Sequence, residues 1–100
     1  MISPDGSATA ATVIICTHNP RAEYFERTLA ALAGQTLSKR RWELCVIDNA
    51  SQPPLSGPCD PSWHPSARII REDRLGLTPA RLRGIAEATG QILILSLIHI

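Results

Sequence analysis

Three short polar segments carry the residues whose chemistry suggests a ligand site. Segment 17–21, Thr-His-Asn-Pro-Arg, combines small polar groups with the start of a predicted helix, where free N–H groups favour anions. Segment 48–51 begins with Asp48, whose carboxylate could accept hydrogen bonds from a nucleobase imide or a ribose hydroxyl. Segment 72–77 contains a glycine close to arginines that could neutralise phosphate, namely Arg71, Arg74, Arg81 and Arg83. Together these residue types suggest a nucleotide site.

The pattern of apolar residues predicts the elements that hold the first two segments. The runs 12–17 and 42–48 are typical of strands that are covered on both faces. We expect a helix between them, with an N-cap at Asn19 and an end just before Gly34. Its apolar stripe comprises Ala22, Phe25, Leu29 and Leu32. Elements joined this closely predict a right-handed βαβ unit with parallel strands.

The second half of the chain repeats the alternation. A short strand is predicted at 67–71, a helix from position 78 onwards, and a strand at 91–95. The buried stripe of this helix is expected to comprise Ala80, Leu82, Ile85, Ala86 and Thr89. We expect 91–95 to be a buried strand at the centre of the sheet. The alternation predicts an α/β fold with a Rossmann-like parallel sheet, in which ligands bind beyond the carboxyl ends of the strands.

Composition narrows the classes of protein. The 100 residues carry a net charge of +1, which provides no long-range field for nucleic acid or an anionic membrane. The apolar run near the C-terminus is about half the length of a membrane span. Three cysteines cannot all pair, so they are interpreted as reduced thiols and the chain as cytoplasmic. We therefore expect no nucleic-acid partner and no membrane segment.

Several of these residues also have simpler interpretations. The histidines and cysteines fit no paired zinc-ligand spacing, and two of the cysteines lie within predicted core strands, which argues against a zinc site or a cysteine nucleophile. Asp48 would also serve as a strand-end cap or in an Asx-turn. Arg74 and Arg81 would otherwise be solvated charges near a helix start. Trp63 and His64 would pin the proline-rich loop in which they lie.

The succession of motifs is similar to that of a known family. The chain resembles the opening of a family-2 glycosyltransferase in four strings: Cys-Thr-His-Asn-Pro-Arg from 16, Trp-Glu-Leu-Cys-Val-Ile-Asp-Asn-Ala-Ser from 42, Arg-Glu-Asp-Arg-Leu-Gly-Leu-Thr-Pro-Ala-Arg-Leu-Arg-Gly from 71, and Ala-Thr-Gly-Gln-Ile-Leu from 88. The resemblance covers residues 12 to about 94 in order. It implies the A-type glycosyltransferase fold, of which this chain would form the N-terminal, nucleotide-binding half, and a nucleotide-diphospho-sugar donor.

By this resemblance five residues would contact the nucleotide of the donor. Thr17 and His18 would line its pocket, and Asp48 matches the acidic residue that binds the nucleobase. Arg74 matches a basic position beside the same nucleotide, and Arg81 lies on the segment that faces the diphosphate. The sequence departs from the family at the leucine after Arg81, where many members carry asparagine.

The resemblance also implies a metal ion for which this chain supplies no ligands. The family places an Asp-x-Asp or Asp-Asp-Asp motif after the strand at 91–95, where it holds Mg²⁺ or Mn²⁺ against the diphosphate. This chain has Ser-Leu-Ile-His-Ile at 96–100 instead. The general base of inverting members would lie further on. We therefore expect a truncated chain that is inactive alone, with the metal bound only by the full-length parent.

We divide the chain into three parts. Residues 1–11 are expected to be a loosely ordered tail, and residues 12–94 the nucleotide-sugar-binding half of a glycosyltransferase domain. Residues 95–100 are interpreted as a non-native tail, because they match the translation of a transposon end used in sequencing libraries.

The expected activity is transfer of a sugar from a nucleotide-diphosphate donor to a hydroxyl acceptor of unknown identity. Uridine is the base that such a pocket most often binds, with guanosine and thymidine as alternatives. The competing hypotheses are a nucleotidyltransferase and a nucleotide-binding α/β module without sugar-transfer activity. A nucleotidyltransferase would usually carry a glycine-rich loop after the first strand, whereas 17–21 contains no glycine.

Overall fold

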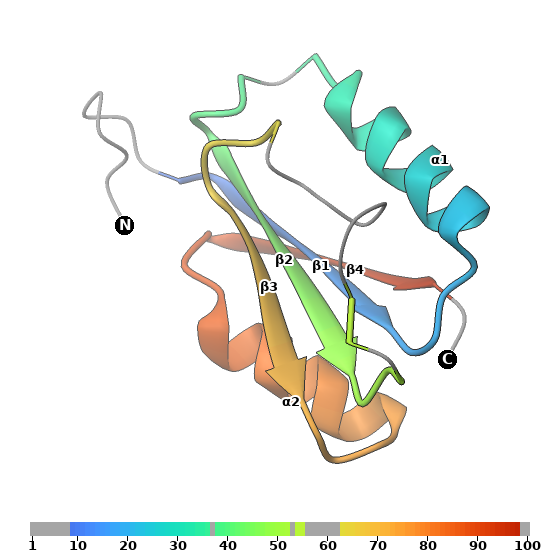
Figure 1. Cartoon of the computed structure of the whole chain (residues 1–100). Coiled ribbons are helices and arrows are strands. Elements are labelled where there is room, and N and C mark those ends of the chain that lie inside the picture. The colour runs from blue at the N-terminus through green and yellow to red at the C-terminus, as the bar shows by residue number, and fades with distance from the viewer. Residues whose placement is uncertain (1–8, 37, 53, 56–62, 99–100) are drawn as a thin grey trace.

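The computed structural model of the chain describes residues 9–36, 38–52, 54–55 and 63–98. Within these residues four strands alternate with two helices (Figure 1). In chain order the elements are β1 (Ala11–Thr17), α1 (Ala22–Ala33), β2 (Trp42–Asn49), β3 (Ala67–Glu72), α2 (Leu77–Glu87) and β4 (Ile92–Ile98). None of the described helices is long and apolar enough to cross a membrane.

The strands form one parallel sheet in the order β3-β2-β1-β4 (Figure 1). β1 therefore lies in the interior and pairs with β2 on one side and β4 on the other. In this register Thr17 lies opposite Asp48, and Asp48 lies opposite Arg71. The predicted α/β fold with a Rossmann-like parallel sheet is confirmed. The carboxyl ends of β1, β2 and β3 consequently meet at one edge.

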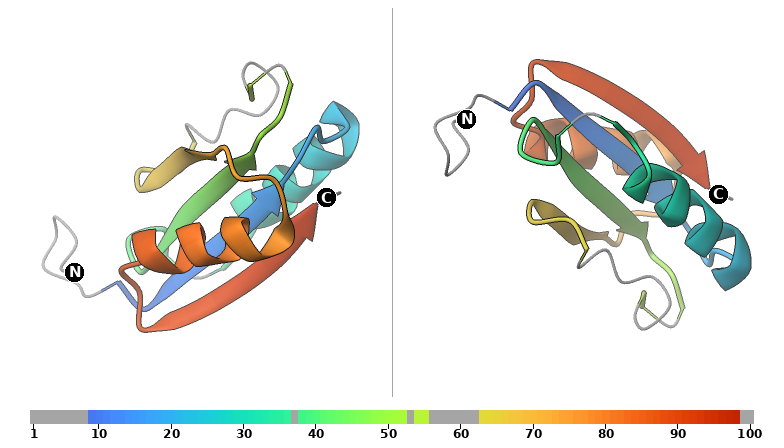
Figure 2. Two further views of the ribbon diagram at one scale, coloured as in Figure 1. Left: turned by 90° about the horizontal axis from the view of Figure 1, so that it is seen from below. Right: turned by 90° about the horizontal axis from the view of Figure 1, so that it is seen from above.

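Each face of the sheet is covered by one helix, so the core has two parts (Figure 2). On one face Phe25 and Leu29 of α1 pack against β1 and β2. On the other face Ala80 of α2 packs against the first three strands. Successive strand residues point to opposite faces, which divides the buried residues between the two parts. They are Ala11, Ile15, Phe25, Leu29, Trp42, Leu44 and Val46 on the α1 face and Ile14, Cys16, Cys45, Ile47, Ile70 and Ala80 on the α2 face.

β2 is buried along its whole length, because β1 and β3 flank it and a helix lies over each of its faces. This position explains why its sequence is a nearly continuous apolar run rather than an alternating one. Burying each large aliphatic side chain of such a strand contributes about 1.5–3 kcal/mol of transfer free energy. Cys45 of β2 and Cys16 of β1 are free thiols, and desolvation raises the pKa of both.

Helix α1 begins later than predicted. Its N-cap residue is Arg21, not Asn19. Asn19 instead adopts a positive φ of 45°, a conformation that asparagine tolerates better than most residues. Its side-chain oxygen accepts a hydrogen bond from the N–H of Gln52, so the side chain serves a contact between loops rather than a cap. At the other end Gly34 follows the helix as predicted, although its φ of −85° does not require glycine.

The buried face of α2 differs from the predicted stripe. Ala80 and Gly84 are its buried residues, whereas Leu82 and Ile85 are 57% and 45% exposed. The apolar pattern predicted that the large side chains of Leu82 and Ile85 face the sheet. That prediction is wrong, because the helix lies so close to β1 that large side chains do not fit between them. A Cβ added to Gly84 would lie 2.4 Å from Cγ2 of Ile14. Only small residues fit between this helix and the sheet.

β4 does not have the position that was predicted for it. It pairs only with β1 and forms one edge of the sheet within the described part of the chain. Ile92, Leu93, Ile94 and Leu95 are 40–61% exposed, and their strand has only one neighbouring strand among the described residues. The prediction of a buried central strand is therefore wrong for the chain as described.

Only parts of the two expected tails belong to the described residues. Residues 1–8 and 99–100 lie outside them. Thr9 is buried, the N–H of Ala10 donates to the carbonyl oxygen of Arg41 at 2.6 Å, and Ala11 already belongs to β1. At the other end, residues 95–98 continue β4 in register with β1.

A buried carboxylate, Glu43, joins α2 to the amino ends of the strands. Its Oε2 accepts hydrogen bonds from the Thr12 hydroxyl at 2.7 Å and from the hydroxyl and N–H of Thr89 at 2.6 Å each. Arg68 lies 3.6 Å from the other oxygen. The N–H of Gly90 donates to the Thr12 hydroxyl, and a Cβ at Gly90 would lie 2.5 Å from the backbone of β1. This network fixes the end of α2 against β1 and β2.

Aromatic contacts fix the chain before β3. The rings of Trp63 and His64 lie 6.2 Å and 4.2 Å, between centroids, from the ring of Trp42 at the start of β2. His64 is buried, and this burial lowers its pKa. These contacts confirm that both residues pin the loop in which they lie.

Candidate functional site

Three polar residues form a row across the carboxyl edge of the sheet. Thr17 ends β1, Asp48 lies opposite it in β2, and Arg71 lies opposite Asp48 in β3. All three continue the alternation of core residues that face α1, so they lie on the same face of the sheet. Thr17 and Asp48 were predicted site residues. Arg71 was recognised only as one of four arginines near a glycine, because its place beside Asp48 depends on strand register.

Asp48 is a buried carboxylate with hydrogen-bond donors on both oxygens, and its side chain is 4% exposed. Its Oδ1 accepts from the N–H of Ser51 at 3.1 Å, and its Oδ2 accepts from the N–H of Leu55 and Nη1 of Arg71, each at 3.1 Å. Burial alone would raise the pKa of Asp48, but the donors of Ser51, Leu55 and Arg71 outweigh it and lower the pKa. Asp48 is therefore an ionised acceptor at neutral pH, and it also makes the strand-end capping contact that the sequence left as an alternative.

The loops after β1 and β2 are held together by reciprocal hydrogen bonds. The N–H of Asn19 donates to the hydroxyl of Ser51 at 2.9 Å, and the N–H of Gln52 donates to the side chain of Asn19 at 2.7 Å. Nδ1 of His18 lies 2.6 Å from the carbonyl oxygen of Asn49. A carbonyl can only accept, so we assign the proton to Nδ1, and Nε2 then accepts from the Asn19 amide. His18 is thereby fixed beside the residue that follows Asp48.

Asn49, which the sequence reasoning did not single out, fixes the loop between β3 and α2. It is fully buried, and its Nδ2 donates to the carbonyl oxygens of Glu72 at 3.0 Å and Arg74 at 2.8 Å. Its Oδ1 accepts from the N–H of Gly76 at 2.9 Å. Gly76 has a φ of 135°, which side-chain-bearing residues rarely adopt. An asparagine at a strand end generally indicates that its side chain forms hydrogen bonds with the backbone. Which loop the side chain contacts depends on the order of the strands in the sheet.

Arg74 is held in place through its backbone, while its guanidinium is paired within the chain. The side chain is 74% exposed, and its Nε donates to Oε2 of Glu72 at 3.1 Å. The hydrogen bonds from Arg74 lower the pKa of Glu72, so the pair is ionised. Arg83 lies 3.9 Å from the other oxygen of Glu72. An anionic ligand would have to compete with Glu72 for Arg74.

Arg81 is exposed on α2 and lies within electrostatic range of the end of β1. Desolvation raises the pKa of the buried Cys16 thiol, and the positive charge of Arg81 opposes that rise. Because Cys16 belongs to the core on the α2 face, Arg81 lies on the opposite side of the sheet from the row that contains Asp48. The five predicted residues thus lie around one edge, with Thr17, His18 and Asp48 together and Arg74 and Arg81 on the α2 side.

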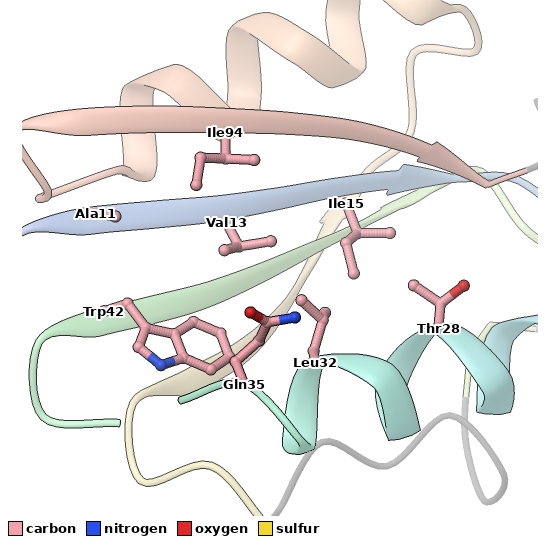
Figure 3. A pocket seen from close by; sticks show the side chains of 8 residues that line it. All are labelled: Ala11, Val13, Ile15, Thr28, Leu32, Gln35, Trp42 and Ile94. Atoms are coloured by element: carbon pink, nitrogen blue, oxygen red, sulfur yellow. The ribbon is translucent and has the colours of Figure 1, made fainter. Parts of the chain in front are cut away.

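A pocket of about 390 Å³ lies away from these residues, between α1 and the sheet. Val13 and Ile15 of β1, Leu32 of α1 and Ile94 of β4 point into it (Figure 3). Its lining is almost entirely apolar and contains none of the polar residues at the carboxyl edge. A charged ligand is therefore better matched to the edge than to this pocket.

The metal that the sequence resemblance implied has no fitting ligands in the described residues. Among them, no group of three or more histidine, cysteine, aspartate or glutamate side chains could hold a metal ion. The carboxylates in and beside the candidate site are those of Asp48, Glu72 and Asp73, and each is engaged with Arg71 or Arg74. No step of the chemistry is therefore assigned to a metal here.

The chain matches a known protein family. The family model described as glycosyl transferase family 2 matches residues 12–96. The matched range contains the residues of the candidate site and the loops around them. These residues are Thr17, His18, Asp48, Arg71, Arg74 and Arg81. A search of curated proteins found no match.

Proposed function

Because this chain belongs to glycosyl transferase family 2, we propose that the carboxyl edge of its sheet binds the nucleotide of a nucleotide-diphospho-sugar donor. The proposed activity of the whole enzyme is transfer of the sugar to a hydroxyl acceptor. The observation that carries the proposal is the buried, ionised Asp48 beside Arg71 at the ends of two neighbouring strands. Parallel α/β sheets bind their ligands at this edge.

Asp48 is proposed to receive the nucleobase. A carboxylate is an acceptor only, so it suits the imide N–H of uracil or thymine or the N1–H of guanine. A carboxylate offers about four lone-pair directions, and the N–H and hydroxyl of Ser51, the N–H of Leu55 and Nη1 of Arg71 face them. The base would therefore take the place of one of these donors, for which the rotatable hydroxyl of Ser51 is best suited. Thr17 and His18 would line the same end of the pocket, because they follow β1 directly beside Asp48.

The diphosphate is proposed to lie towards Arg74 and Arg81. Both are exposed cations near the start of α2, and the backbone of Arg74 is fixed by Asn49. To bind phosphate, Arg74 would exchange its contact with Glu72 for one with the ligand, while Arg83 remains near Glu72. Charge-assisted bonds of this kind are about twice as strong as neutral ones. The assistance of Mg²⁺ or Mn²⁺ in the departure of the nucleotide stays a prediction.

We further propose that the protein acts in a reducing compartment such as the cytoplasm. The support is that Cys16 and Cys45 are both free and buried in the core.

The proposal is tested by measuring nucleotide affinity by calorimetry. We expect UDP, GDP or dTDP to bind, and Asp48→Asn to weaken binding of the preferred nucleotide roughly 10- to 100-fold, as expected for a lost hydrogen bond to a charged group. Ser38→Ala is the matched control, because Ser38 is exposed and far along the chain from the row. Binding that Asp48→Asn leaves unchanged, in a variant with wild-type circular dichroism, would rule out the proposed role of the carboxyl edge.

A further inference from the structure

Arg71 lies between Asp48 and a second carboxylate. Its Nη1 donates to Oδ2 of Asp48 at 3.1 Å and to the carbonyl oxygen of Ser51 at 2.9 Å. Its Nε donates to Oδ1 of Asp73 at 2.7 Å. Bonds to three different residues hold the planar guanidinium in one orientation. The side chain of Arg71 is 31% exposed and that of Asp73 is 82% exposed, so Asp48 is the interior end of this series of contacts.

The donors to Asp48 are not equivalent. Ser51, through its N–H and its hydroxyl, and Leu55, through its N–H, belong to the same loop, so they hold the carboxylate from within its own segment. Arg71 belongs to a neighbouring strand and carries a full positive charge. Arg71 is therefore the donor that ties the orientation of Asp48 to the sheet and also neutralises its charge.

We propose that Arg71 is a positioning residue for nucleotide recognition, which holds the Asp48 carboxylate in the orientation in which it receives the imide N–H of the nucleobase. This inference rests on the proposed function, because it concerns the same site. Arg71 acts through Asp48 rather than on the base itself. A lysine at position 71 would supply the charge without the planar fork, so charge and geometry can be separated by substitution.

Other titratable groups surround Asp48 and have to be distinguished from Arg71. Asp73 lies behind Arg71 on the β3 side, and His18 lies on the loop after β1. Glu72 and Arg74 are paired with one another on the α2 side. Because histidine is itself a titratable residue, a His18→Asn variant accompanies the experiment.

The test is a calorimetric titration of UDP, GDP and dTDP against the full chain from about pH 4 to about pH 8, the range in which carboxyl and imidazole groups titrate. We expect Arg71→Met to weaken nucleotide binding roughly tenfold at neutral pH, since it removes one charge-assisted hydrogen bond from Asp48. It should also move the loss of binding in acid to higher pH, because Asp48 without its cation protonates more readily. Arg71→Lys should keep most of the acid profile while losing part of the affinity.

Arg27→Met is the matched control, since it removes the same charge from the exposed face of α1, where Arg27 contacts the ring of Tyr24 instead of Asp48. It should leave the acid profile unchanged. In an Asp48→Asn background, Arg71→Met should cause no further loss of affinity.

Three results would overturn the inference in distinguishable ways. An acid profile that Arg71→Met does not move, with wild-type binding intact, would reject the role of Arg71 and leave the nucleotide site standing. If Arg71→Met weakened nucleotide binding as much in the Asp48→Asn background as in the wild type, Arg71 would contact the nucleotide directly. Absence of UDP, GDP and dTDP binding by the wild-type chain would reject the proposed function, and this inference with it.

Discussion

Replacing Asn49 tests how far one buried amide holds the loop between β3 and α2. The side chain makes three hydrogen bonds, to the backbone of Glu72, Arg74 and Gly76, at 2.8–3.0 Å. A typical intramolecular hydrogen bond contributes about 1 kcal/mol net. Asn49→Ala removes all three hydrogen bonds, so we expect it to lower the free energy of unfolding by about 3 kcal/mol. Water that reaches the partly buried loop replaces some of the lost hydrogen bonds and reduces this loss. That is a large share of the stability of a small domain.

Asn49→Asp is the sharper variant. It keeps the size of the side chain but turns the Nδ2 donor, which faces the carbonyl oxygens of Glu72 and Arg74, into an oxygen. At neutral pH an anion would then face two acceptors in a buried position, so we expect a loss at least as large as that of Asn49→Ala. Because a protonated carboxyl regains one donor, part of this loss should be recovered in acid.

The assay is urea unfolding followed by circular dichroism, with the transition midpoint and slope fitted for each variant. Ser38→Ala is the control, since its hydroxyl accepts one hydrogen bond on the exposed surface and we expect a change within about 0.5 kcal/mol. If Asn49→Ala lay within the same margin, the amide would not be what fixes this loop. The placement of Arg74 in the candidate site would then lack its structural basis.

Three further predictions concern the frame of the site. Gly84→Ala should destabilise the fold by about 1 kcal/mol, because overpacking against Ile14 outweighs the gain in helix propensity; a stabilised variant in urea unfolding would show that α2 can move away from β1. Gly76→Ala should cost about 1–3 kcal/mol in the same assay through its φ of 135°, and an unchanged midpoint would contradict the strained conformation. Burial alone would raise the pKa of Glu43, but the hydrogen bonds of this residue lower the pKa below its ordinary value of 4.5. The ionised carboxylate therefore stabilises the fold above pH 4.5, and this stabilisation is lost as the pH falls through the lowered pKa. The stability difference between wild type and Glu43→Gln should therefore be largest near neutral pH and shrink in acid, and a difference that grows on acidification would refute this assignment.

The sequence predicted the fold better than the details of packing. Continuous β-branched runs identify strands covered on both faces, and the closely spaced helix between them implies parallel pairing, so the pairing of β1 with β2 followed from pattern alone. The position of β4 at the edge of the described sheet did not. The face of α2 did not, because periodicity assumes that the largest apolar residues point inward. Gly84 shows the opposite here, since the backbones of α2 and β1 are too close for a side chain.

The candidate site divides in the same way. Asp48 could be recognised because it lies at the end of a buried strand, where a carboxylate can meet a ligand or a loop. Arg71 and Asn49 could not, because their roles depend on register and on the loop that each reaches. A single sequence indicates where strands end. It does not indicate which residues of neighbouring strands and loops become partners, because that depends on the order of the strands in the sheet.

The most direct test of the central claim is a map of backbone amide shifts on adding UDP or GDP to isotopically labelled protein. The account predicts that the largest changes fall on residues 17–19, 48–52 and 71–76, which surround the carboxyl edge of the sheet. Changes centred instead on the apolar pocket between α1 and β4, or no saturable changes with either nucleotide, would contradict it.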